Sequence, residues 1–213
     1  KLPASRVRFT KLDTISLDKK VQLIVEGKSD AEIIEHAFYV LTGQSPYWSI
    51  KPAGNESGGA IEVSKVIMNC KSLIDKNGVI IGIFDHDAKG LQEFRGLKPS
   101  VFEKYINDTV RKHISCEAYA LLLPVPGEMD IYLKKDQSFN FFEIEHYFGK
   151  TFLVENDIVE STDIPEVYKI KESKKKALSK LVRGLQNKEH FIYFIDLFNA
   201  IDKITGIEPE YTL

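Results

Sequence analysis

One short segment near the middle of the chain limits the fold more than any other feature. Val79–Phe84 contains five apolar residues and one glycine, and Asp85-His86-Asp87 follows it at once. A run of this length without a polar residue is typical of a strand that is buried on both faces, and such strands belong to parallel sheets covered by helices. The segment therefore predicts an α/β protein in which Asp85 and Asp87 follow the carboxyl end of a central strand.

Strand and helix patterns alternate around this segment. The other expected elements are strands at Val21–Val25, Trp48–Pro52 and Ala118–Leu123, a helix that starts at the capping box Ser29-Asp30-Ala31-Glu32 and ends at Gly43, and a second amphipathic helix from Val63 to Ile74. Strands that alternate with helices of about a dozen residues are typical of βαβ units. The pattern predicts a Rossmann-like parallel sheet flanked by helices.

The chain divides into three parts at the level of sequence. Residues 1–20 are basic and lack periodicity, so we expect a linker or edge segment from a preceding domain. The first residue is Lys1 rather than Met, which favours a fragment whose natural N-terminus lies in another domain. We expect residues 21–127 to form the core and residues 128–213 to form a helical C-terminal part.

The C-terminal part separates its charges. Residues 139–166 carry seven acids and one lysine, whereas residues 171–188 carry seven bases and one acid, although the whole chain has a net charge of only −2. Taken alone, this pattern favours a solvated loop followed by a solvated helix face. Beside a carboxylate site it suits a surface that holds cations and polyanions together. We expect a short helix around Glu143 and Glu145, a basic helix over 172–186, and a final amphipathic helix over 191–201 that packs on the sheet.

The remaining composition predicts a cytoplasmic protein. No apolar run approaches the roughly 18 residues of a membrane span, and no signal-peptide pattern opens the chain. Cys70 and Cys116 are far apart in sequence without metal-ligand spacing, so we expect two reduced, partly buried thiols.

The acids at the strand ends form the candidate site. Glu26 follows the first strand, Asp30 lies one helical turn further on, and Asp85 and Asp87 alternate, so they can point the same way while His86 points elsewhere. Ligands of open α/β sheets bind beyond the carboxyl ends of the strands. Several carboxylates together need a cation, and hard oxygen ligands favour Mg²⁺ or Mn²⁺ over Zn²⁺. The D-x-D pattern alone also fits a solvated turn.

These motifs resemble a known family. Val25-Glu26-Gly27-Lys28-Ser29-Asp30, followed by Phe84-Asp85-His86-Asp87-Ala88-Lys89-Gly90, resembles the Toprim domain of topoisomerases, DnaG-type primases and several nucleases. The later chain is similar to the C-terminal Toprim nuclease domain of the OLD (overcoming lysogenization defect) family, which includes the nuclease subunit of the Gabija phage-defence system. The similarity covers roughly residues 20–205.

The resemblance implies a role for each matching residue. It implies catalytic roles for Glu26, Asp85, Asp87 and Lys175. It implies metal ligands at Glu26, Asp30, Asp85, Asp87, Glu143 and Glu145, with Glu145 preferred to Glu143. We expect nucleic-acid contacts at Lys28, Lys89, Lys174 and Lys176, although Lys28 and Lys89 fit solvated turn residues equally well. Because Lys174, Lys175 and Lys176 adjoin one another, the position of the catalytic lysine can shift by one residue.

The resemblance also implies an activity and partners. It implies a metal-dependent DNA endonuclease or nickase with two Mg²⁺ ions per site, which Mn²⁺ or Ca²⁺ can replace in binding. An ABC-type ATPase domain is expected N-terminal to it in the same parent chain, with homo-oligomerisation through that domain and a part in phage defence or DNA processing. The alternatives are another Toprim enzyme (topoisomerase- or primase-like), a non-catalytic Toprim scaffold or regulatory module, and a phosphoacceptor aspartate as in response regulators, which leaves Glu26 unexplained.

Overall fold

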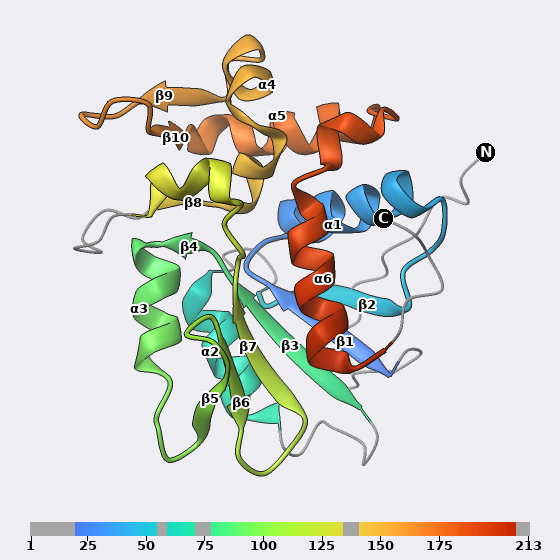
Figure 1. The fold of residues 1–213 in the computed structure, drawn as a ribbon, viewed down its shortest axis with the longest axis vertical. Coiled ribbons are helices and arrows are strands. Elements are labelled where there is room, and N and C mark those ends of the chain that lie inside the picture. The colour runs from blue at the N-terminus through green and yellow to red at the C-terminus, as the bar shows by residue number, and fades with distance from the viewer. Residues whose placement is uncertain (1–19, 55–58, 71–77, 134–140, 208–213) are drawn as a thin grey trace.

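A six-stranded sheet with helices on both faces organises the molecule (Figure 1). The computed structural model describes residues 20–54, 59–70, 78–133 and 141–207, so the expected linker over residues 1–20 lies almost wholly outside the described residues. The strands are β1 (Val21–Val25), β2 (Trp48–Pro52), β3 (Val79–Phe84), β5 (Phe102–Ile106), β6 (Val110–His113) and β7 (Ala118–Leu122). Across the sheet they lie in the order β2-β1-β3-β7-β6-β5.

The four predicted strands are confirmed, and β2, β1, β3 and β7 run parallel. The hairpin of β5 and β6 was not predicted. It extends the sheet with two antiparallel strands, so the expectation of a parallel sheet holds for four of the six strands. Strand β5 lies at the edge and exposes Glu103, Lys104 and Tyr105 in succession. It therefore lacks the apolar pattern by which a buried strand is detected.

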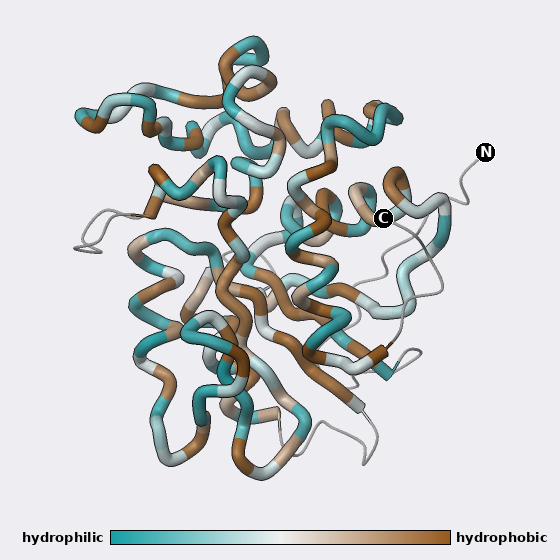
Figure 2. Tube along the Cα trace, viewed as in Figure 1, coloured by the Kyte–Doolittle hydropathy of each residue, from teal (hydrophilic) through white to brown (hydrophobic). Residues whose placement is uncertain are grey.

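Alternate residues of β3 enter two separate apolar clusters. Ile81 and Ile83 pack with α1 (Lys28–Thr42) and α6 (Phe194–Thr205). Ile80 and Phe84 pack on the other side with α2 (Ala60–Met68) and α3 (Ala88–Gly96). Figure 2 shows hydrophobic residues concentrated along the central strands. The expectation of a central strand buried on both faces is confirmed.

Helix α1 starts differently from the expectation. The N-cap is Gly27, and Oδ2 of Asp30 accepts a hydrogen bond from the Gly27 backbone N–H at 2.8 Å. The expected capping box of Ser29 and Glu32 is wrong, because the helix begins one residue before Ser29 and Glu32 turns away to accept a hydrogen bond from Ser179. Gly43 ends the helix in the left-handed conformation, as expected.

The C-terminal part contains strands as well as helices, so the expectation of a helical extension needs correction. Its elements are η2 (Gly127–Tyr132), β8 (Phe141–Phe142), η3 (Ile144–Phe148), α4 (Lys150–Glu155), β9 (Val159–Ser161), β10 (Tyr168–Ile170), α5 (Glu172–Val182), η4 (Lys188–Phe191) and α6. Strands β9 and β10 form a hairpin, and β8 pairs with the two-residue strand β4 (His86–Asp87). Figure 1 shows β8, α4 and the β9–β10 hairpin beyond β4, whereas α6 lies along the sheet.

The predicted basic helix corresponds to α5, which ends four residues earlier than expected. The predicted final helix is confirmed as α6, and its Phe198 packs against Trp48 of β2 and Phe38 of α1. The predicted second helix corresponds to α2, whose expected last turn falls partly outside the described residues. Within the described ranges, no helix combines the length and the apolar character that crossing a membrane requires. The domain boundary at residue 127 stays a prediction.

Candidate metal centre

The first two predicted acids lie side by side because β1 and β3 are neighbouring parallel strands. Ile24 of β1 pairs with Gly82 of β3, so both strands end at the same edge of the sheet. Glu26 follows β1 and Asp85 follows β3. Oε1 of Glu26 accepts a hydrogen bond from the backbone N–H of Asp85 at 3.3 Å.

Asp87 is held by the start of the next helix. It is the N-cap of α3, and its Oδ1 accepts a hydrogen bond from the Gly90 N–H at 2.6 Å. Asp85 faces a different donor, the backbone N–H of Ile144 at 3.3 Å. His86, between the two aspartates, points elsewhere as expected: its Nδ1 lies 3.1 Å from the Leu123 carbonyl oxygen.

The pairing of β4 with β8 carries two more acids to this edge. His86 pairs with Phe142, so the segment that follows Phe142 passes directly over the ends of the central strands. Glu143 and Glu145 are buried there, with exposed fractions of 7% and 1%. Both carboxylate oxygens of Glu145 lack a hydrogen-bond partner among the described residues. A buried polar group without a partner is costly, and such groups mark places where a ligand completes the bonding.

A buried histidine that the sequence analysis did not single out holds this acidic segment. Nδ1 of His146 accepts a hydrogen bond from the Glu143 backbone N–H at 3.0 Å, and Nε2 lies 3.1 Å from the carbonyl oxygen of Tyr168 in β10. Burial lowers the pKa of His146 to about 4, so the ring is neutral near pH 7. In the sequence, the position of His146 directly after Glu143-Ile144-Glu145 was the one feature that could have indicated this role.

The structure distinguishes the three adjacent lysines of α5. Nζ of Lys175 lies 2.5 Å from Oε2 of Glu143, whereas Lys174 forms an ion pair with Asp157 at 2.8 Å. Lys176 is exposed. Only Lys175 of the three reaches the acidic segment, because successive residues of a helix point in directions about 100° apart.

The carboxyls influence one another strongly. Burial, together with repulsion from Glu26, Asp30, Glu143 and Glu145, raises the pKa of Asp85 well above its usual value. Burial is also the main cause that raises the pKa of Glu26 to about 7 and of Glu145 to about 8. The pKa values of Asp30 and Glu143 are raised for the same reason. Although burial opposes it, attraction to Glu145 and Glu143 raises the pKa of Lys175. The cluster is therefore short of positive charge.

The donor set suits a hard divalent cation, although the carboxylates do not converge on one point. Within the described ranges, no group of three His, Cys, Asp or Glu side chains is arranged so that it could hold an ion as it stands. Asp30, Asp87 and Glu143 each face an N–H group or a lysine instead. The acids offer only oxygen donors, and both carboxylate oxygens of Glu145 lack a partner among the described residues.

The four lysines predicted to contact nucleic acid differ in their surroundings. Lys28 lies at the exposed start of α1, 3.9 Å from Glu32. Lys89 is exposed, and its charge lowers the pKa of Glu26, so it lies close to the acidic cluster. Lys174 and Lys176 are on α5 beside Lys175. Contacts of all four lysines with nucleic acid stay predictions.

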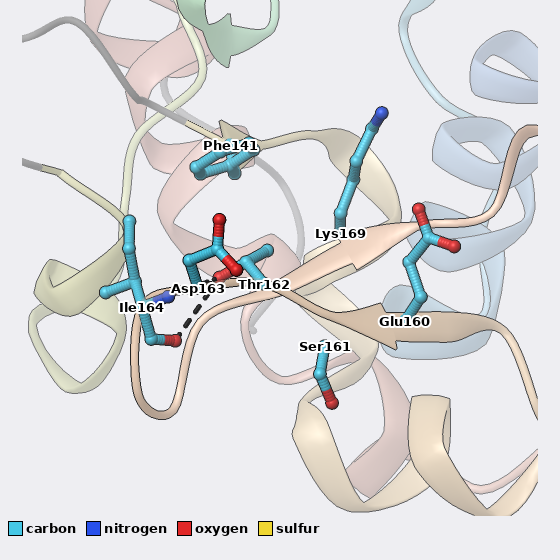
Figure 3. A pocket seen from close by; sticks show the side chains of 7 residues that line it. All are labelled: Phe141, Glu160, Ser161, Thr162, Asp163, Ile164 and Lys169. Atoms are coloured by element: carbon cyan, nitrogen blue, oxygen red, sulfur yellow. Dashed lines mark hydrogen bonds between the residues drawn. The ribbon is translucent and has the colours of Figure 1, made fainter.

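A hollow of about 520 Å³ lies between Phe141 and the β9–β10 hairpin (Figure 3). Phe141, which pairs with Asp87, forms one wall. Residues of the β9–β10 hairpin form the rest, as the figure shows: Glu160, Ser161, Thr162, Asp163, Ile164 and Lys169. None of the predicted catalytic or metal-binding residues lines it.

The chain was compared with protein families, curated proteins and solved structures. None of them matches it. A functional assignment therefore depends on the geometry of the acidic cluster itself.

Gly90 is expected to tolerate no side chain. A Cβ atom at this position would lie 2.0 Å from the backbone oxygen of Asp85, far inside van der Waals contact. Gly90→Ala should displace the start of α3 from Asp85 and lower the free energy of unfolding by about 1–3 kcal/mol. Urea denaturation measures this change. As control, Gly96→Ala, where a Cβ meets nothing within 4 Å, should be close to neutral; equal losses in both variants would contradict the prediction.

Ion binding should stabilise the fold more at pH 8 than at pH 6. The folded-state pKa values of Glu26 and Glu145 lie above the ordinary value of 4.5, so the native state binds more protons than the unfolded state between about pH 4.5 and 8. Stability in EDTA should therefore fall as the pH rises through this window. At a concentration of 100 times the dissociation constant at pH 8, Mg²⁺ or Mn²⁺ should add about 2.7 kcal/mol, or roughly 5–10 °C in Tm. The same concentration should add less at pH 6, because protons then compete with the ion for the carboxylates.

A matched pair of variants tests the origin of this effect by differential scanning fluorimetry. Glu145→Gln should remove much of the gain from Mn²⁺ and weaken the fall in Tm with pH in EDTA, because it removes a buried carboxyl. Glu155→Gln, at the exposed end of α4, should behave as the wild type. A wild-type Tm that responds to neither pH nor Mn²⁺ would rule out the ion site.

Proposed function

We propose that this chain is a Mg²⁺-dependent endonuclease or nickase that hydrolyses phosphodiester bonds of DNA, with a Toprim-type fold. One observation carries the proposal: three separate segments of the chain gather Glu26, Asp30, Asp85, Glu143 and Glu145 at one edge of the sheet, with Lys175 beside them. The other four acids all raise the pKa of Asp85. Carboxylates placed together at this cost are typical of cation sites that act on phosphate.

The fold is in keeping with the proposal. Glu26 and Asp85 follow neighbouring parallel strands of a sheet in which β3 is central. Ligands of open α/β sheets bind at this edge. The Toprim resemblance and the expected ABC-type ATPase domain in the parent chain remain parts of the proposal.

Each residue has a physical role in the proposed site. When bound, divalent cations neutralise charge on the oxygens of the reacting phosphate. Glu26, Asp30, Asp85 and Glu145 would hold them, and Asp87 has a second task as the N-cap of α3. The ammonium group of Lys175, whose raised pKa keeps it protonated, would face the negative charge that develops on the phosphate. His146 keeps the Glu143–Glu145 turn in place through its hydrogen bond to the Glu143 N–H.

The first test is an ion-dependent cleavage assay. Purified protein is incubated with supercoiled plasmid and with linear DNA in Mg²⁺, Mn²⁺, Ca²⁺ or EDTA. Nicked and cut products are expected with Mg²⁺ and Mn²⁺ and none with EDTA. The absence of products on every DNA form in both ions would overturn the proposal.

A second candidate is a non-catalytic Toprim module that serves a partner domain. The observation in its favour is that the described acidic side chains do not converge on an ion position as they stand. Mn²⁺ soaked into crystals discriminates between the two. Anomalous peaks beside Asp85 and Glu145 support the nuclease, whereas their absence at high Mn²⁺ supports the non-catalytic module.

A further inference from the structure

Two cysteines that are distant in sequence are neighbours in the fold. Cys70 follows α2, Cys116 precedes β7, and their Sγ atoms lie 3.9 Å apart. Both are free thiols. The pair lies near the amino end of β7, whereas the acidic cluster lies at the carboxyl ends of the parallel strands. The thiol pair is thus separate from the proposed nuclease site.

Packing holds the two thiols in this arrangement. Cys70 is fully buried in the apolar cluster between the sheet and α2, and its Sγ donates a hydrogen bond to the carbonyl oxygen of Ile67 at 2.9 Å. Cys116 is half-buried at the rim of the same cluster. Its carbonyl oxygen accepts a hydrogen bond from the Ala118 N–H at 2.9 Å. A disulfide bond of about 2.05 Å requires the sulfurs to approach by about 1.9 Å, a distance within the range of side-chain rotation.

We propose that Cys70 and Cys116 form a reversible intramolecular disulfide when the protein meets a low-molecular-weight disulfide such as oxidised glutathione. The half-exposed Cys116 reacts first. Its thiolate attacks one sulfur of the small disulfide, which forms a mixed disulfide and releases one small thiolate. Cys70 then loses its proton and attacks Sγ of Cys116, which releases the second small thiolate. Two protein thiols become one disulfide, one small disulfide becomes two thiols, and the two protons pass to the released thiolates.

The different surroundings of the two sulfurs support this order. Burial, and then the proximity of Cys116, raises the pKa of Cys70 to about 12, so Cys70 is a poor first nucleophile in water. Once Cys116 carries the mixed disulfide, Cys70 is already beside the sulfur that it must attack. The second step is therefore favoured by proximity rather than by reactivity. A reducing compartment would return the pair to thiols.

The crosslink would close a loop of the chain that contains β3 and the two aspartates, and so stabilise the fold. The cysteines are 46 residues apart, and β3, Asp85, Asp87, α3 and the β5–β6 hairpin all lie between them. Crosslinks that close loops of this length stabilise mainly by restricting the unfolded chain. We expect the oxidised protein to melt roughly 5–10 °C above the reduced protein.

Mass spectrometry of the whole chain tests the proposal. The wild type is incubated with oxidised glutathione, alkylated, and analysed intact and after proteolysis without reductant. We expect one chain that has lost two hydrogens, no alkylated cysteine, and a linked peptide pair containing Cys70 and Cys116. Dithiothreitol should restore both thiols and the lower Tm.

Two variants provide the controls. Cys70→Ala should keep glutathione on Cys116 because nothing resolves the mixed disulfide, and Cys116→Ala should stay largely unmodified because Cys70 is buried. A wild type that retains two alkylatable thiols, keeps glutathione on Cys116, or links two chains would overturn the proposal. The wild-type result stands without the variants should either fail to fold, and no readout depends on nuclease activity.

Discussion

Asp85→Asn is expected to reduce Mg²⁺-dependent cutting of DNA on the order of 1,000-fold, the upper part of the range for the loss of one group that stabilises a transition state. Asp85 is the acid on which the other acids act: Glu26, Asp30, Glu143 and Glu145 all raise its pKa. Asparagine keeps the size and the oxygen that accepts the Ile144 N–H, but it removes the negative charge that attracts a cation. The initial rate of plasmid nicking at saturating Mg²⁺ measures the loss.

The fold of this variant should remain intact. Burial and the neighbouring acids make the ionised form of Asp85 unfavourable in the folded state. Because Asp85→Asn removes this carboxyl, the Tm of the variant in EDTA at pH 8 should equal or exceed that of the wild type. Glu155→Gln serves as the matched control and should cut at the wild-type rate. Cutting by Asp85→Asn at an undiminished rate would exclude the proposed mechanism, whatever the Tm.

Lys175→Met is expected to lower the cutting rate by roughly 100-fold or more, since it removes the one lysine of α5 that faces the acids. The loss should appear in the rate at saturating DNA rather than in DNA affinity, because the ammonium group acts on charge that develops during the reaction. Single-turnover rates and a separate binding titration in Ca²⁺ distinguish the two. Methionine keeps much of the length and the apolar stem of lysine.

Other lysines of α5 provide controls for this experiment. Lys180→Met, on the exposed side of α5, should leave the cutting rate unchanged. Lys174→Met breaks an ion pair with Asp157 at the surface and should change the rate at saturating DNA little, even if it lowers DNA affinity. If Lys174→Met abolished cutting while Lys175→Met did not, the assignment of Lys175 would be wrong.

Local sequence patterns were sufficient to predict the parallel strands of the sheet and most of the helices. The unbroken apolar run of Val79–Phe84 predicted a central strand, and the spacing of apolar residues predicted α6. The edge hairpin of β5 and β6 was missed because its exposed strand has no apolar run. The start of α1 was misplaced because several polar residues near Gly27 are each able to cap a helix, and only the backbone path selects one.

The positions of Glu26 and Asp85 after buried strands follow from local sequence, because a strand buried on both faces leaves a nearly unbroken apolar run. The further groups that join Asp85 follow from the packing of distant elements. The β4–β8 pairing brings in Glu143 and Glu145, the rotation of α5 selects Lys175, and the packing of α2 beside β7 places Cys70 next to Cys116. These contacts depend on how distant elements pack, and no periodicity within either segment encodes them. Local patterns fix which face of an element is buried, whereas the packing of the whole chain fixes the partner on that face.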